Sequence, residues 1–423
     1  MKAYMPRLVD HVLENKLKGK GAVLIQGPKW CGKTTTAEQF SNSVLYMDEP
    51  ERREQNMQLA DISPSTLLKG DTPRLIDEWQ IAPKLWDAVR FAVDHRDGKG
   101  HFILTGSSVP ADLSETSHSG TGRFAWLTMR NMSLFESKES SGEVSLRDLF
   151  DGKQDIGGIN TLSIERISYL VCRGGWPDTL DLEEEIALDA AVDYLDGVVN
   201  SDISRVDNVN RDPERARRIM RSYARNQGTQ IAYTEIAKDI STNELQFTDE
   251  TVASYLKALK RIFVVEDMPA WNPNLRSKVS MRATDTRYFS DSAIAAAALG
   301  IGPRDLINDL NTFGLLFETM CIRDLRTYTD ILNGSVYHYR DRSGLECDAV
   351  VHLRNGQYGL VEIKLGGDRL INEGASNLLK LEKMIDTEKM NAPTFKMILT
   401  GTDHYAYKRR DGVLVVPIGC LRD

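Results

Sequence analysis

The feature that most constrains this chain is an eight-residue loop, GPKWCGKT, that begins at Gly27. It fits the pattern G-x-x-x-x-G-K-[S/T] at every fixed position, with Gly32, Lys33 and Thr34 at the required spacing. An apolar run at residues 22–25 precedes the loop, and a helix-prone stretch follows it. This order of strand, loop and helix predicts a phosphate-binding loop, in which backbone amides and a helix N-terminus surround the phosphates of a nucleotide.

The residues in and near this loop have separate expected roles. Lys33 is expected to reach the β- and γ-phosphates and assist catalysis, and the hydroxyl of Thr34 to bind Mg²⁺. A later apolar strand ends in the acids Asp77 and Glu78. We expect Asp77 to hold the Mg²⁺ through water and Glu78 to polarise the attacking water. The predicted nucleotide contacts are Gly27, Pro28, Lys29, Trp30, Cys31, Gly32, Lys33, Thr34, Thr35, Thr105 and Ser107.

Three polar side chains outside the loop are further candidates for the nucleotide site. Thr105 and Ser107 lie at the end of the next apolar strand, where a polar group can sense the γ-phosphate; the alternative is a simple polar strand end. Arg123 is a candidate catalytic arginine for the γ-phosphate, supplied within one chain or across a subunit boundary of a homo-oligomer. The alternative for Arg123 is a solvated side chain.

The order of five motifs carries a family resemblance. The segments GPKWCGKT, LIDEWQ, FILTGSS, GRFAWLTMRNMSLFE and RGGWPDTL follow one another as in prokaryotic AAA-type ATPases that have a C-terminal domain of unknown function, which this chain resembles over nearly its whole length. The resemblance implies ATP and Mg²⁺ as cofactors, and a winged helix followed by a restriction-endonuclease-like fold. It also marks Asp202, without a role. Residues 137–160 depart from the family pattern and are interpreted as a linker or loop excursion.

The pattern of expected elements predicts an α/β protein with three domains. Residues 1–150 alternate short apolar strands with helices, which indicates a P-loop NTPase domain with a parallel sheet of the AAA (ASCE) type. Residues 151–300 are mainly helical and end in the order helix, helix, strand, which is typical of a winged helix. Residues 301–423 run helix, three strands, helix, strand, in agreement with a PD-(D/E)XK nuclease-like domain.

Charge is distributed unevenly along the chain. The 53 basic and 61 acidic residues give a net charge of −8, yet basic residues outnumber acidic ones between residues 205 and 287. The second helix of the expected helix-turn-helix carries Lys257, Lys260 and Arg261 near its end, where they could contact DNA phosphates. The alternatives are that the winged helix acts as a lid or a protein contact, and that the arginine run at residues 211–225 is a solvated helix face.

A second candidate site lies near the C-terminus. Asp348, Glu362 and Lys364 form the spacing D-x13-E-x-K, and Glu318 lies upstream on an expected helix. This set resembles the metal site of PD-(D/E)XK nucleases, with Glu318, Asp348 and Glu362 as Mg²⁺ ligands and Lys364 as the catalytic lysine. Glu362 and Lys364 share a strand face. A tight two-residue turn at residues 355–356 would leave Asp348 on the opposite face. Asp348 joins the other two only if the strands are connected by a three-residue loop with a bulge, or if the strand is irregular near Asp348.

The composition argues against several other classes of protein. A chain with 41% hydrophobic and 27% charged residues, no long apolar run and no leader-like start is expected to be cytoplasmic, without a membrane partner. Five scattered cysteines exclude a disulfide framework. We predict an ATP-binding, Mg²⁺-dependent ATPase that acts in DNA processing or defence through its winged helix and nuclease-like domain. The alternative is a nucleotide-gated switch or DNA-binding regulator with an inactive nuclease-like domain.

Overall fold

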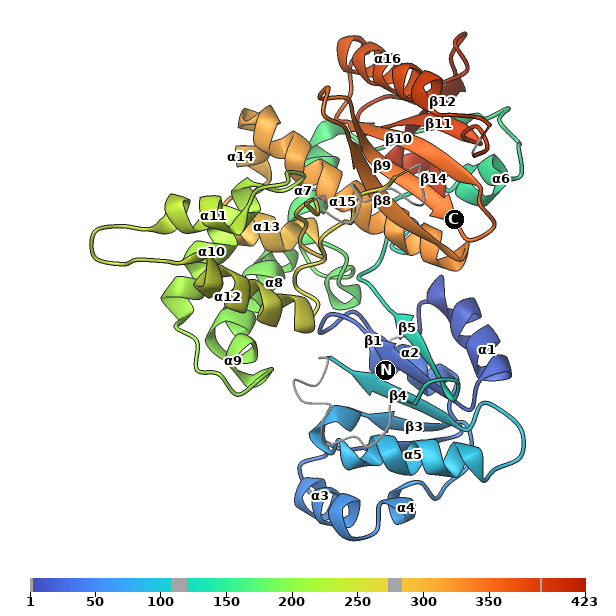
Figure 1. The fold of residues 1–423 in the computed structure, drawn as a ribbon, viewed down its shortest axis with the longest axis vertical. Coiled ribbons are helices and arrows are strands. Elements are labelled where there is room, and N and C mark those ends of the chain that lie inside the picture. The colour runs from blue at the N-terminus through green and yellow to red at the C-terminus, as the bar shows by residue number, and fades with distance from the viewer. Residues whose placement is uncertain (1–2, 108–119, 273–283, 389) are drawn as a thin grey trace. The chain divides into compact units, whose positions relative to one another are not determined.

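The computed structural model describes residues 3–107, 120–272, 284–388 and 390–423. Contacts divide the chain into two compact units, whose elements are labelled in Figure 1. The first unit contains Met1–Asn131, Asn200–Arg211 and Lys257–Phe263, and the second contains Met132–Val199, Asp212–Leu256 and Val264–Asp423. The three-domain division of the sequence stays a prediction.

A five-stranded parallel sheet forms the centre of the first unit, in the order β2-β3-β4-β1-β5 (Figure 1). Parallel strands place their carboxyl ends at the same edge of a sheet. Because β4 lies between β1 and β3, the ends of these three strands are neighbours. The predicted parallel α/β sheet is confirmed. Its strands are β1 (Ala22–Gln26), β2 (Ser43–Tyr46), β3 (Arg74–Asp77), β4 (Phe102–Gly106) and β5 (Phe124–Thr128).

Helices cover both faces of this sheet, which explains why its strands are continuous apolar runs. On β1, Ala22 and Leu24 belong to one core cluster, which contains Trp86, while Val23 and Ile25 belong to a second cluster with residues of α1 and α2. The alternation follows from the two-residue period of a strand. The helical elements of this part are α1 (Val9–Gly19), α2 (Lys33–Gln39), α3 (Arg53–Ile62), α4 (Pro64–Leu67), η1 (Trp79–Ile81) and α5 (Lys84–Asp94).

The middle of the chain is helical, as predicted. Among the described residues, no helix is both long enough and apolar enough to cross a membrane. The elements are α7 (Ile164–Arg173), η3 (Pro177–Thr179), α8 (Glu184–Gly197), the π-helical turn η4 (Val198–Asp202), α9 (Ile203–Arg205), α10 (Pro213–Arg225), α11 (Tyr233–Ile240), α12 (Asp249–Arg261), α13 (Ser292–Leu299) and α14 (Pro303–Asn308).

The two helices of the expected helix-turn-helix are present as α11 and α12. The strand expected at residues 263–267 is not a regular strand. Val265 forms an isolated antiparallel bridge with Phe289, and Met268 forms another with Thr286. The winged-helix assignment therefore remains a prediction.

A mixed seven-stranded sheet lies in the second unit, in the order β7-β12-β13-β11-β10-β9-β8. Its order of helix, three strands, helix and strand agrees with the prediction for residues 301–423. Figure 1 shows α15 and α16 beside this sheet. The elements are α15 (Leu310–Ile331), β8 (Gly334–Arg340), β9 (Glu346–Leu353), β10 (Tyr358–Lys364), α16 (Asp368–Met384), β11 (Phe395–Thr400), β12 (Tyr405–Lys408), β13 (Leu414–Pro417), η6 (Ile418–Cys420) and β14 (Leu421–Arg422).

The interpretation of residues 137–160 as a linker is wrong. This segment forms β6 (Val144–Ser145), α6 (Leu146–Phe150) and β7 (Gly158–Ile159). β6 pairs with β14, and β7 forms the edge of the seven-stranded sheet next to β12. The buried side chain of Asn160 donates hydrogen bonds to the carbonyls of Gly401 and Asp403. Two-residue strands leave no periodic signal, so the Ser- and Gly-rich composition dominated the prediction.

A buried ionic group holds the second unit together. The Arg323 guanidinium lies 3.1 Å from Asp291 and 2.8 Å from Asp324, and all three side chains are at most 2% exposed. The two carboxylates also accept hydrogen bonds from the backbone amides of Gly175 and Leu134. Each charge is thus paired and hydrogen-bonded, which is the condition under which buried charges persist.

Replacing Arg323 by Met should destabilise the second unit by about 3–5 kcal/mol, because it leaves two buried carboxylates without their cation. Urea unfolding of the full chain, followed by circular dichroism, measures the loss. The control is Arg218→Met, which removes the exposed ion pair with Glu214 and should cost less than about 1 kcal/mol. Equal, small effects of both substitutions would contradict the role given to this group.

Candidate functional site

Two glycines of the predicted phosphate-binding loop are required by the backbone. Gly27 has φ +152°, and a Cβ at this position would lie 2.0 Å from the carbonyl oxygen of Met129. Gly32 has φ +98° and precedes the first residue of α2. A side chain is disfavoured at both positions by backbone conformation, and at Gly27 also by the close approach of another chain segment. The loop therefore connects the end of β1 to the start of α2 along the path that its motif predicts.

Polar groups inside the loop fix its shape. The ammonium of Lys33 donates to the carbonyls of Gly27, at 3.0 Å, and Pro28, at 2.7 Å. Nη1 of Arg7 donates a hydrogen bond to the carbonyl oxygen of Cys31, at 2.7 Å, and Nη2 donates one to the carbonyl oxygen of Arg130, at 2.9 Å. Arg7 is 6% exposed, so this clamp is shielded from water. Sequence reasoning missed Arg7, since a single arginine before the first strand belongs to no motif.

The Asp77 carboxylate connects the end of the phosphate-binding loop to the end of β4. Oδ1 of Asp77 accepts hydrogen bonds from the hydroxyls of Thr34, at 2.7 Å, and Thr105, at 2.5 Å. Three residues predicted separately therefore converge at the carboxyl edge of the sheet. A hydroxyl oxygen and a carboxylate oxygen at a helix N-terminus form the hard, partial ligand set that suits Mg²⁺, which keeps several of its waters.

Glu78 lies next to this point in an unusual conformation. Its φ of 53° and ψ of 44° are left-handed. Its carboxylate accepts hydrogen bonds from the amide of Gln80 and, at 3.4 Å, from the hydroxyl of Ser107. Burial raises the pKa of Glu78, the negative charge of Asp77 raises it further, and the ammonium of Lys33 opposes the rise. Such a carboxylate is suited to accept a proton.

The other predicted loop contacts differ in exposure. Trp30 has φ +64° and is 60% exposed, and Thr35 is exposed at the start of α2. The ammonium of Lys29 lies 2.7 Å from the carboxylate of Asp202, within the same unit. Asp202, which the sequence marked without a role, thus pairs with a loop residue.

The prediction that Arg123 reaches the γ-phosphate within its own chain is wrong. Arg123 immediately precedes β5, and its carbonyl accepts from the amide of Ala22 at the start of β1. It lies at the amino edge of the parallel sheet, opposite the phosphate-binding loop. Its guanidinium binds Asp94 at 2.8 Å. A role across a subunit boundary stays a prediction.

In the C-terminal sheet, the turn needed for the second candidate site is present. Leu353 donates to the carbonyl of Gln357, which leaves a three-residue loop between β9 and β10. The register pairs Val361 with Ala349, so the next step brings Asp348 beside Glu362. The pairing of β9 with β8 is also irregular here. The structural condition set by the sequence is therefore met.

The ammonium of Lys364 bridges the two acids of this cluster. It lies 3.0 Å from Asp348 and 2.7 Å from Glu362, which is 2% exposed. Glu318 is half-buried and accepts a hydrogen bond of 2.5 Å from the hydroxyl of Tyr288, a residue the sequence did not identify. Burial raises the pKa of Glu318 and of Glu362, and the charge of Asp348 raises both further.

The predicted triple-carboxylate metal arrangement is not seen in this conformation. Within the described ranges, no group of three or more His, Cys, Asp or Glu side chains is placed to hold a metal ion. Instead, the Lys364 ammonium pairs with both Asp348 and Glu362, as a bound cation would.

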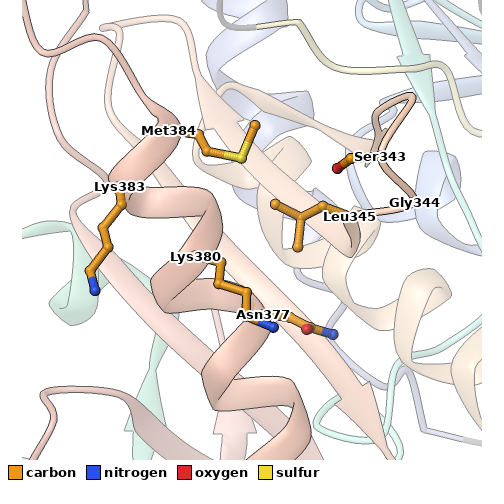
Figure 2. A pocket seen from close by; sticks show the side chains of 7 residues that line it. All are labelled: Ser343, Gly344, Leu345, Asn377, Lys380, Lys383 and Met384. Carbon is orange, nitrogen blue, oxygen red and sulfur yellow. The ribbon is translucent and has the colours of Figure 1, made fainter.

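A groove of about 480 Å³ lies between α16 and the turn that joins β8 to β9. Figure 2 shows Leu345 and Met384 on opposite sides of it. On α16, a Cβ added at Gly374 would lie 3.4 Å from Cβ of Glu362 and 3.6 Å from Cε of Lys364, about one helical turn before Asn377. The lining residues are Ser343, Gly344, Leu345, Asn377, Lys380, Lys383 and Met384.

The basic middle segment is largely neutralised. On α10, Arg217, Arg218 and Arg225 pair with Asp196, Glu214 and Asp239, while the opposite face of the helix is buried. At the end of α12, Arg261 lies 3.7 Å from Asp207. These ion pairs favour the solvated-face alternative for the arginine run.

Three family models match separate segments of this chain. Residues 19–138 match a family model described as an AAA domain, and residues 164–305 and 313–421 match two domains of unknown function, DUF8612 and DUF4143. Residues 19–138 form an AAA-type P-loop domain. This match supports ATP binding and hydrolysis, and it contains the loop, both acids and the β4 residues described above.

Individual known proteins are also similar to this chain. Two curated proteins, from Mycobacterium bovis and Mycobacterium tuberculosis and both described as uncharacterized, are 25% identical over 355 residues, which are 83% of this chain and 72% of theirs. A solved Walker-type ATPase of Pyrococcus abyssi is 14% identical, with a TM-score of 0.43, over 68% of this chain and 94% of that chain.

Replacing Arg7 by Met should weaken Mg-ATP binding about 5- to 100-fold, because the carbonyls of Cys31 and Arg130 lose their shared donor, worth about 1–3 kcal/mol. Titration calorimetry measures the change. Lys18→Met, which removes an exposed ion pair on α1, is the control and should bind normally. Unchanged affinity in folded Arg7→Met would show that the clamp is dispensable.

Proposed function

We propose that this chain is a Mg²⁺-dependent ATPase whose nucleotide state is coupled to a winged-helix segment and a nuclease-like domain, in DNA processing or defence. The observation that carries the ATPase proposal is the convergence of Thr34 and Thr105 on the Asp77 carboxylate, beside Glu78. A phosphate-binding loop alone would be consistent with nucleotide binding. The half-buried acid Glu78 next to it adds a group for the hydrolytic step.

In the proposed reaction, the loop amides and Lys33 bind the triphosphate. Thr34 and Asp77 would hold Mg²⁺, which supplies charge neutralisation of the β- and γ-phosphates when bound. Glu78 orients the attacking water and accepts its proton as the water oxygen bonds to the γ-phosphorus. Ser107, hydrogen-bonded to Glu78, and Thr105, hydrogen-bonded to Asp77, connect the γ-phosphate region to the end of β4.

Lys33→Ala should abolish measurable Mg-ATP binding, because it removes the cation of the loop. Glu78→Gln should retain binding but lower the hydrolysis rate by about 10²-fold or more, since a carboxamide accepts no proton. Calorimetry and phosphate release measure the two effects, with Lys18→Met again as the control. Normal turnover in either variant would refute the assigned site.

A second candidate function concerns the C-terminal domain. The shared face of Asp348, Glu362 and Lys364 supports a nuclease-like site. The two ion pairs of Lys364 favour instead a domain that binds nucleic acid without cutting it, because a metal ion would have to displace the ammonium. In that case the chain acts as a nucleotide-gated switch.

The groove along α16 supports nucleic acid as the partner. Lys380 and Lys383 are exposed on α16, and neither has an acidic partner among the described residues. Two unpaired ammonium groups attract phosphates, and the apolar side chains of Leu345 and Met384 offer a surface for bases.

The double substitution Lys380→Gln/Lys383→Gln should weaken single-stranded DNA binding about 10-fold and reduce the slope of log affinity against log salt by about 1.4. Fluorescence anisotropy at several salt concentrations measures both. Arg369→Gln on the same helix is the matched control, since Arg369 is already paired with Glu373. An unchanged slope would exclude this groove. Adding Mn²⁺ to the same mixtures separates the two candidates: cleavage that Lys364→Ala abolishes supports the nuclease.

A further inference from the structure

We propose that Gln80 is a positioning residue for ATP hydrolysis, holding Glu78 through its amide nitrogen and the attacking water through its amide oxygen. The inference rests on the proposed ATPase function. Gln80 lies in η1, directly after the acidic pair. The left-handed conformation of Glu78 turns the chain sharply, so that the two side chains meet and Nε2 of Gln80 donates to Oε2 of Glu78.

The conformation of Glu78 indicates that this contact is maintained against a local cost. A residue other than glycine in the left-handed region is strained by roughly 1 kcal/mol or more, and such strain persists where the surroundings impose it. The following residue, Trp79, is 1% exposed and anchors η1 in the core of the unit. The backbone at Gln80 is therefore anchored to the core through Trp79.

The other end of the same amide points to a ligand. Oε1 of Gln80 is buried and accepts no hydrogen bond from the described residues. A buried amide oxygen without a donor costs about 1–3 kcal/mol, so native structures supply one. The donor must approach next to the Glu78 carboxylate, because the amide nitrogen is fixed on it.

Gly106 makes room for this amide. A Cβ at Gly106, the last residue of β4, would lie 2.7 Å from Oε1 of Gln80 and 3.2 Å from the indole nitrogen of Trp79. Glycine in a strand weakens it and often marks a close approach. Its neighbours Thr105 and Ser107 donate to Asp77 and Glu78. Oε1 of Gln80 therefore lies at the edge where the γ-phosphate is expected.

The chemistry of the attacking water fits two neighbouring acceptors. One proton of the water binds the Glu78 carboxylate and the other binds Oε1 of Gln80, which directs the oxygen lone pair at the γ-phosphorus. As the new oxygen–phosphorus bond forms, the bond from the γ-phosphorus to the bridging oxygen breaks and ADP leaves with that electron pair. Glu78 takes the first proton. Gln80 exchanges none, since a carboxamide is neutral throughout.

The test compares Gln80→Leu with Gly106→Ala, using phosphate release for kcat and calorimetry for Mg-ATP binding. Gln80→Leu should lower kcat about 30- to 100-fold while the Kd for Mg-ATP stays within about 3-fold. Gly106→Ala should lower kcat similarly, because the new methyl group displaces the amide. The double variant should be no slower than the slower single variant, since both remove one interaction.

Two matched controls accompany these variants. Gln58→Leu adds the same apolar side chain on the exposed surface of α3, and Gly19→Ala adds a methyl group where no atom lies within 4 Å. Both should hydrolyse ATP normally. A wild-type kcat in Gln80→Leu, or a loss explained by weaker binding alone, overturns the inference. If Gln80→Leu fails to fold, normal kcat in Gly106→Ala overturns it. Absence of hydrolysis by the wild-type chain would instead refute the proposed ATPase function.

Discussion

The hydrogen bonds that converge on the Asp77 carboxylate join three parts of the chain that are far apart in sequence. Thr34 comes from the start of α2, Thr105 from the end of β4, and Asp77 itself from the end of β3. A partly buried carboxylate is costly unless donors surround it, so these contacts fix the edge of the sheet as one polar unit. The left-handed turn at Glu78 then places a second acid beside the first.

Much of this edge follows from the sequence, because its parts have fixed spacing or periodicity. Local sequence patterns predict the loop motif, the acidic pair and the parallel sheet, and the structure contains all three. Arg7 and Tyr288 had no such pattern: each is a single polar residue whose partner comes from the tertiary fold. Gln80 contacts a residue only two positions away, but that contact depends on the left-handed conformation of Glu78. Arg123 was misplaced because its position depends on where β5 begins, one residue later.

The ion pairs of the charged residues could likewise be predicted from the sequence only in part. The sequence reveals a basic middle segment, but not that Asp196 and Asp239, from other helices, lie next to its arginines. Near the C-terminus, by contrast, the strand period was enough to predict that Glu362 and Lys364 share a face, whereas the three-residue turn that brings Asp348 beside them is seen only in the structure. Local geometry was predictable, whereas neutralisation by distant partners was not.

The folding of residues 137–160 onto the last part of the chain changes where the protein can be divided. A fragment that starts at residue 301 would lose β7 and β6, and so expose backbone edges of β12 and β14 that are paired in the whole chain. Unpaired edges invite association with other strands. A fragment meant to fold and act independently should therefore begin at residue 132. A shorter C-terminal fragment would aggregate through its unpaired strand edges, whatever its binding or catalytic activity.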